Sequence, residues 1–362
     1  MWNANDGLFE RSCANGGLGS MTDDDQLRRA DRLIWGLIAI TVGMVAAACI
    51  GGSFHIVWTS FQAVGIASLL LCLVGGFYST RKDARAASAL LCTAQFALFP
   101  SVGAPLSYVA ASAGLPLWDE TFASWDRSLG LDWMAWLTTM NNHVELHRIF
   151  AFAYSSFMPQ AAIVIVALAL TGHLLHLRLY ILSFILAALV TIAVSAALPA
   201  QGVWGHLQLS SGNYPAITPV TRELHLGIFN GLRDGTFRDL VAHGAEGIIT
   251  FPSLHTAGGF LFIFAMWPVR YLRWIFALLN ITMIVATPVD GGHYFSDVIA
   301  GTGIAVLCWM AAARILHASR TTAEHIAEIP ASPSIEPDLI PCPVEVTLAP
   351  DAESAPRSVA QA

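Results

Sequence analysis

Eight apolar runs follow one another between residues 33 and 316 of this 362-residue chain. Most have the length that a helix needs to cross the hydrocarbon core of a bilayer, roughly 20 residues. A segment inside lipid must satisfy its own backbone hydrogen bonds, so such runs indicate helices. The sequence therefore predicts an all-α fold, a polytopic transmembrane helical bundle of about eight spans. The runs cover residues 33–53, 56–78, 87–112, 148–170, 178–199, 254–269, 272–290 and 294–316.

The two ends of the chain differ in composition from this membrane domain, residues 33–316. The whole chain is 55% hydrophobic and 12% charged, with a mean hydropathy of +0.60, whereas a soluble domain is about a quarter charged. Residues 1–32 are expected to form a cytoplasmic N-terminal tail. Residues 317–362 are acidic and rich in Pro, Ala and Ser, and we expect a disordered tail. Because most of the net charge of −7 belongs to this tail, the charge does not describe a substrate site.

Basic residues indicate the orientation of the bundle. With eight spans, the connections richest in Lys and Arg all fall on one side, which the positive-inside rule makes the cytoplasm. The two long polar connections, residues 113–147 and 200–253, are then expected to face the periplasm or the exterior of an inner or plasma membrane. The residues that carry this bias are Arg28, Arg29, Arg32, Arg81, Lys82, Arg85, Arg178, Arg270, Arg273, Arg314 and Arg320.

Two polar segments interrupt the apolar pattern at the predicted outer face. FPSLHTAGG (251–259) opens the sixth run, and the segment 287–301, which contains GGHYFSD, joins the seventh run to the eighth. Span counting therefore brings His255, His293 and Asp297 to one level of the membrane. Ionisable groups are costly at that depth, so their presence is a hypothesis of function.

The spacing within these segments favours acid–base or nucleophilic chemistry. Asp297 follows His293 by four residues, one helical turn, and can accept a hydrogen bond from one imidazole nitrogen while the other keeps its lone pair. Gly292 allows the backbone to approach a ligand closely. Ser253 lies where a helix begins, and it suits either phosphate binding at the free N–H groups or simple capping.

At these residues the chain resembles the type 2 phosphatidic acid phosphatase superfamily of membrane lipid phosphate phosphatases. PSLH followed by GHYFSD is most similar to the branch that includes inositol phosphorylceramide synthase and other inositolphosphotransferases, with Leu254 in place of the usual Gly. The resemblance extends more loosely to DRSLGLDW (126–133), AYSSFMPQ (153–160) and LRDGTF (232–237). It implies a six-helix core, a lipid phosphate substrate among membrane lipids, and no metal or other cofactor.

The resemblance also implies roles for the site residues. His293 would attack phosphorus to form a phosphohistidine, Asp297 would orient it, and His255 would protonate the leaving oxygen. Water as acceptor would make the protein a phosphatase, and an alcohol such as inositol or a sugar would make it a phosphotransferase. Both acceptors stay open.

Signature cations are missing from two motifs of the superfamily. The K-x6-R-P signature is absent, and Ala286 and Thr287 occupy the Ser and Arg positions of S-R-x5-H-x3-D. The groups that bind phosphate must therefore come from elsewhere. Arg233 is the first candidate, ahead of a set that also lies on the predicted outer side: Arg222, Arg238, Arg127 and Arg148.

The remaining polar residues allow other interpretations. HVELH (143–147) has two histidines in i, i+4 spacing and, with His206, His225 and His243, could hold zinc, but an interfacial amphipathic helix flanked by Trp133 and Trp136 is favoured. Asp126 and Arg127 are expected to pair. No basic cluster typical of nucleic-acid binding is present. A non-catalytic membrane protein, or a transporter that uses the same His and Asp groups as a proton relay, is the alternative function.

Overall fold

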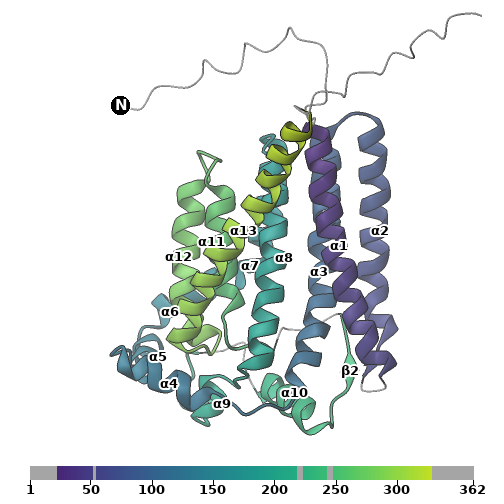
Figure 1. The fold of residues 1–362 in the computed structure, drawn as a ribbon. Coiled ribbons are helices and arrows are strands. Elements are labelled where there is room, and N and C mark those ends of the chain that lie inside the picture. Colours follow the sequence, from purple (N-terminus) through teal and green to yellow (C-terminus); the bar gives the residue numbers. More distant parts are fainter. Residues whose placement is uncertain (1–22, 52–53, 218–222, 243–247, 328–362) are drawn as a thin grey trace, which may run out of the picture.

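The computed structural model describes residues 23–51, 54–217, 223–242 and 248–327 (Figure 1). The expectations for residues 1–22 and 328–362, and those for Arg222 and His243, fall outside this part of the chain. The described fold is all-α and polytopic, as predicted. Its long helices are α1 (Asp23–Ile50), α2 (Trp58–Thr80), α3 (Ala84–Ala111), α8 (Leu174–Ala197), α12 (Arg273–Asp290) and α13 (Phe295–Ala327).

Within the described residues, these six helices are long and apolar enough to cross a membrane, and a bent pair brings the number to seven if it forms one span, against the expected number of about eight. The fourth predicted span is broken into α6 (Val144–Ser155) and α7 (Phe157–Leu170), which are bent by 51° relative to each other. Pro159 lies in the first turn of α7, where it removes a backbone donor and disfavours continuation of α6. The sixth predicted span is the short helix α11 (Leu254–Met266), which ends just before Pro268.

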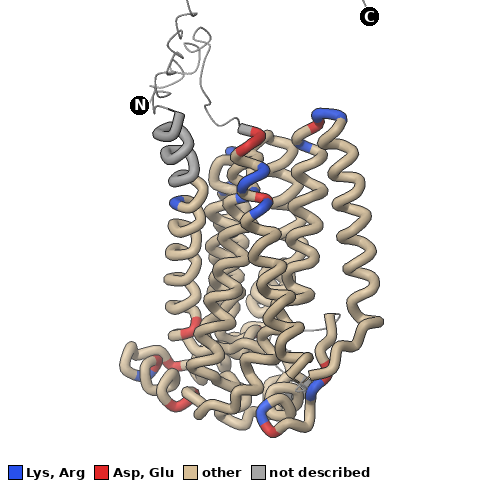
Figure 2. The backbone as a smooth tube through the Cα atoms, turned by 45° about the vertical axis from the view of Figure 1, so that its right-hand side comes forward, with Lys and Arg blue, Asp and Glu red and all other residues tan. Residues whose placement is uncertain are grey.

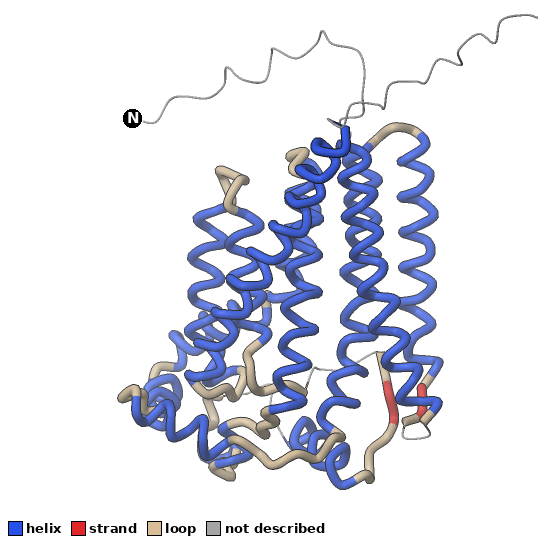
Figure 3. The backbone as a smooth tube through the Cα atoms, in the orientation of Figure 1, coloured by secondary structure: helices blue, strands red, loops and turns tan. Residues whose placement is uncertain are grey.

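The two long polar connections lie together at one end of the bundle (Figure 1). They contain α4 (Asp119–Ser128), α5 (Trp133–Asn142), α9 (Val203–His206), the 3-10 turn η1 (Ser211–Asn213) and α10 (Glu223–Asp234). We call these four α-helices the end cap. The short strands β1 (His55–Ile56) and β2 (Asp239–Leu240) pair in parallel at the same end, with His55 opposite Asp239 (Figure 3).

Most of the described Lys and Arg residues lie at the opposite end of the bundle, and a smaller group lies at the end that carries the end cap (Figure 2). This arrangement agrees with the predicted topology, and the assignment of the basic end to the cytoplasm stays a prediction. Near the beginnings of α1 and α8, Arg178 and Asp31 form a buried ion pair with a distance of 3.0 Å from Nη2 to Oδ2. Gln95 on α3 also donates to Asp31, so this pair ties three helices together.

We predict that Arg178→Ala lowers the free energy of unfolding by about 3–5 kcal/mol, because Asp31 would keep a poorly solvated charge without its partner. The side chains of Arg178 and Asp31 are 3% and 17% exposed. Arg28→Ala is the control, since Arg28 pairs with Asp25 in an exposed contact whose loss should cost about 0–1 kcal/mol. Denaturant titration in mild detergent measures both, and equal losses would contradict the prediction.

Candidate active site

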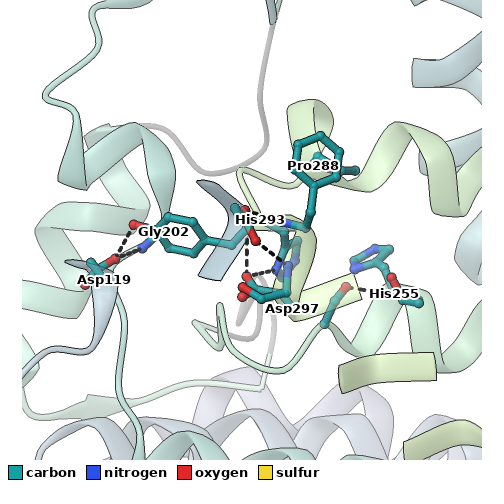
Figure 4. Close-up of polar contacts among 12 residues, drawn as sticks. Asp119, Gly202, His255, Pro288, His293 and Asp297 are labelled. Atoms are coloured by element: carbon teal, nitrogen blue, oxygen red, sulfur yellow. Dashed lines mark hydrogen bonds and ion pairs between the residues drawn. The ribbon is translucent and has the colours of Figure 1, made fainter. Parts of the chain in front are cut away.

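The turn between α12 and α13 presents a buried histidine–carboxylate pair (Figure 4). His293 Nδ1 lies 3.0 Å from Asp297 Oδ2, and the two side chains are 6% and 0% exposed. The backbone N–H of Tyr294 donates to the same oxygen at 3.0 Å. The helical spacing of four residues thus places the carboxylate on the imidazole. When an ionised Asp297 accepts this bond, His293 is the Nδ1–H tautomer and its lone pair is on Nε2.

The start of α11 brings His255 to the same place. Ser253 caps this helix by accepting a hydrogen bond from the N–H of Thr256, and its own N–H donates to the carbonyl of Asp297 at 3.2 Å. The segments 251–259 and 287–301 are therefore joined directly. The cap uses the Ser253 hydroxyl as an acceptor, which is compatible with the same hydroxyl donating to a phosphate.

Tyr154 on α6 lies between the two histidines. Its ring stacks on the His255 ring with centroids 4.3 Å apart, and its hydroxyl lies 3.3 Å from His255 Nδ1. A Cβ on Gly291 would come within 2.7 Å of the Tyr154 hydroxyl and 2.6 Å of His293 Cδ2. Tyr154 and His293 thus approach Gly291 closely, and only glycine leaves room for both. Gly292 follows with a φ of +67°, a left-handed conformation that favours glycine.

The end cap supplies two buried carboxylates that hold this turn. Asp126 on α4 accepts from the N–H groups of Phe295 and Ser296, each at 2.8 Å, and so caps α13 from a distant part of the chain. Asp119 accepts from the N–H groups of Gln201 and Gly202 and from the Tyr294 hydroxyl. Burial raises the pKa of both carboxyls, and these hydrogen bonds oppose the shift.

The expected pairing of Asp126 with Arg127 is wrong. Arg127 instead forms an exposed ion pair with Glu120 at 2.7 Å. Adjacent residues on a helix point in different directions, so one side chain of α4 faces α13 and the next faces outward. The expected interfacial role of Trp133 is incomplete as well, because its buried Nε1 donates to the carbonyls of Pro288 and His293, each at 3.1 Å.

Burial dominates the electrostatics of the site. It lowers the pKa of His293 to about 4, partly opposed by a hydrogen bond to the Thr250 backbone. His225 on α10 also has its pKa lowered to about 4, first by burial and then by the positive charge that His293 would carry. His293 is therefore neutral near pH 7 and keeps one ring nitrogen unprotonated, which a nucleophile or base needs.

The missing signature arginine has no direct replacement at its own position. Thr287 is completely buried, and its hydroxyl donates to the carbonyl of Met283 in the same helix at 2.9 Å. The contacts of Arg233 are with other segments: its Nη2 donates to the Leu115 carbonyl, and its guanidinium stacks over Phe229. The structure thus gathers Ser253, His255, Gly292, His293 and Asp297 but does not show Arg233 in contact with them.

In the described residues, no group of three or more His, Cys, Asp or Glu side chains is placed to hold a metal ion. His147 of the HVELH segment contacts a carboxylate of α12 instead.

Sequence reasoning missed the roles of Tyr154 and Trp133 in the site. Both lie in segments with the looser family resemblance, AYSSFMPQ and DRSLGLDW. Their contacts join positions more than 100 residues apart, and no local pattern encodes them.

These features define an integral membrane protein with a buried histidine-based site at one end of its bundle. Residues 120–311 match the family model described as the PAP2 superfamily. This match covers more than half of the chain and includes all three proposed catalytic residues, so the chain belongs to the PAP2 superfamily. A search of curated proteins and a search of solved structures returned no match. The closer resemblance to inositol phosphorylceramide synthase stays a prediction.

We predict that Gly291→Ala destabilises the fold by about 1–3 kcal/mol, because the new methyl group would press on His293, on the Tyr154 hydroxyl and on the Thr287 carbonyl. Gly303→Ala is the matched control in α13, where a Cβ meets nothing within 4 Å. Thermal unfolding in detergent measures both variants. A Gly291→Ala protein as stable as the Gly303→Ala protein would show that the turn tolerates a side chain.

Proposed function

We propose that this protein is a membrane enzyme that transfers the phosphoryl group of lipid phosphate esters at the extracytoplasmic face of the inner or plasma membrane. The acceptor is water or an alcohol such as inositol. The observation that carries the proposal is the buried His293–Asp297 hydrogen bond, with His255 brought beside it by the start of α11. Membership of the PAP2 superfamily supports a phosphatase or phosphotransferase activity.

The proposed reaction has two steps. In the first, the Nε2 lone pair of His293 attacks phosphorus, the P–N bond forms, and the ester P–O bond breaks. His255 relays a proton from the phosphate group of the substrate to the leaving oxygen, while the Asp297 carboxylate stabilises the positive charge that develops on His293. In the second, His255 passes a proton from water or an alcohol to the phosphate group, and the oxygen displaces His293 from phosphorus and restores the enzyme.

Phosphate binding is proposed to use backbone N–H groups and polar side chains around the two segments. Ser253 lies at the N-terminus of α11, where helix N–H groups favour an anion, and Gly292 has no side chain to hinder a close approach to its backbone. Arg233 is the proposed cation. Its Nη1 is buried and has no hydrogen-bond partner among the described residues, so a donor is available there.

Incubation of the purified protein with lipids carrying a radiolabelled phosphate tests the mechanism. Wild type should form an acid-labile phosphoprotein, and His293→Ala should abolish it because the nucleophile is gone. The matched control is His173→Ala, a histidine N-terminal to α8 that takes no part in the proposed site. Radiolabelled phosphoprotein in His293→Ala would show that His293 is not the nucleophile. Addition of inositol or glycerol distinguishes the acceptors, since only a transferase forms a new phosphate ester.

The pH dependence of phosphoenzyme formation is a separate prediction. Protonation removes the attacking lone pair, so the rate should fall as the pH drops through the pKa of His293, about 4, rather than through the ordinary histidine value of 6.5. Single-turnover rates between about pH 3.5 and about pH 8 measure this pH dependence, and near-UV circular dichroism verifies folding at each pH. A rate that falls near the ordinary histidine pKa instead would show that the buried environment does not set the pKa of the nucleophile.

A proton-relaying transporter is the alternative, and the broken α6–α7 pair is a feature that many transporters share. The ionisable groups of this site, however, lie at the beginnings of α11 and α13 beside the end cap. A transporter would form no phosphoenzyme, so the labelling experiment also separates these two functions.

A further inference from the structure

A second buried histidine–carboxylate pair lies next to the first. His147 Nε2 on α6 is 2.9 Å from Asp290 Oδ1 at the end of α12, and both side chains are 5% exposed. Asp290 precedes His293 by only three residues. The other oxygen of this carboxylate, Oδ2, is buried and has no hydrogen-bond partner among the described residues. His147 therefore supplies the side-chain hydrogen bond that the structure shows for Asp290.

One face of α6 contacts both halves of the site. His147 and Tyr154 are separated by seven residues, two helical turns, and so lie on the same face. His147 contacts Asp290 of α12, and Tyr154 contacts His255 of α11. A displacement of α6 would therefore move the surroundings of His255 and His293 together.

The turn that joins Asp290 to His293 consists of two glycines and has no side chains of its own to hold it. External contacts fix it instead. Trp133 donates to the carbonyls of Pro288 and His293, and the N–H of Val203 donates to the carbonyl of Gly292. The His147–Asp290 bond is the contact at the first residue of this turn.

We propose that His147 and Asp290 are positioning residues that fix the glycine turn and thereby the imidazole of His293 in its orientation toward phosphorus. This proposal rests on the proposed function. Loss of the His147 side chain leaves a buried carboxylate without its partner, and the carboxyl group must then become protonated or move toward solvent. Either response shifts the residue from which the turn begins. A misplacement of about 1 Å can lower a catalytic rate by about 100-fold.

A buried side-chain pair that only stabilises the bundle serves as the control, because its loss should not change the rate. Asn280 Nδ2 donates to Gln160 Oε1 at 2.6 Å, and this buried bond joins α7 to α12 as His147–Asp290 joins α6 to α12. Asn280 lies ten residues before Asp290 and so lies far along the helix from the turn. Gln160→Ala should weaken the bundle without altering His293.

The test compares wild type, His147→Ala, His147→Gln and Gln160→Ala. His147→Ala should slow phosphoenzyme formation by about 10- to 100-fold with the KM changed less than about 2-fold, because orientation rather than substrate binding is lost. His147→Gln should recover much of the rate, since its amide can place a donor where Nε2 was. Gln160→Ala should retain the wild-type rate even where its unfolding temperature falls as far as that of His147→Ala.

Nitrogen-15 NMR of the histidine side chains gives a readout that does not depend on activity, with His293 identified by its absence in His293→Gln. Wild type should show the Nδ1–H tautomer that the bond to Asp297 selects, and His147→Ala should show a mixture of tautomers. An unchanged His293 signal together with an unchanged rate would overturn the positioning role. An equal loss of rate in Gln160→Ala would overturn it as well. Absence of a phosphoenzyme in wild type would refute the proposed function, while the NMR comparison would still decide the positioning role.

Discussion

The capping of α13 is the interaction on which the rest of the site depends. The first N–H groups of a helix have no partner within it, and lipid offers none. In this protein Asp297 accepts from the N–H of Tyr294, and Asp126 accepts from Phe295 and Ser296. One cap comes from the helix itself and the other from the end cap. The same few bonds therefore fix where α13 begins, hold the end cap against the bundle, and place the Asp297 carboxylate on His293.

Local patterns in the sequence predicted the features that depend on a few neighbouring residues. Apolar length predicted the bundle, and span counting placed the segments 251–259 and 287–301 at one end. Breaks within the spans followed from proline positions that length alone does not reveal, at Pro159 and Pro268. Trp133, Tyr154 and Asp119 act through contacts between distant segments, so a single sequence offers no means of pairing them with their partners. The assumption that neighbours pair failed for Asp126 and Arg127 because a helix separates adjacent side chains.

Thr287 occupies the position at which the signature of the superfamily has an arginine. A side chain at this position is completely buried, and the threonine satisfies its hydroxyl on its own helix. Burial of an unpaired guanidinium would be costly, so an arginine here requires an anion or a carboxylate within reach. The carboxylates nearest the turn are each bonded to a histidine, Asp297 to His293 and Asp290 to His147. A phosphate bound here would therefore depend more on hydrogen bonds and backbone N–H groups than the signature residues would require.

The break between α6 and α7 has a structural consequence that a straight span would lack. A bend of 51° directs α7 along the bundle while α6 lies against the end of α12. The bend costs backbone hydrogen bonds at the junction, and side-chain hydroxyls near it, those of Ser155 and Ser156, donate to carbonyls of α6. In return, His147 and Tyr154 reach two different helices from a single face. The broken span thus joins the start of α11, which carries His255, to the end of α12, from which the turn to His293 begins.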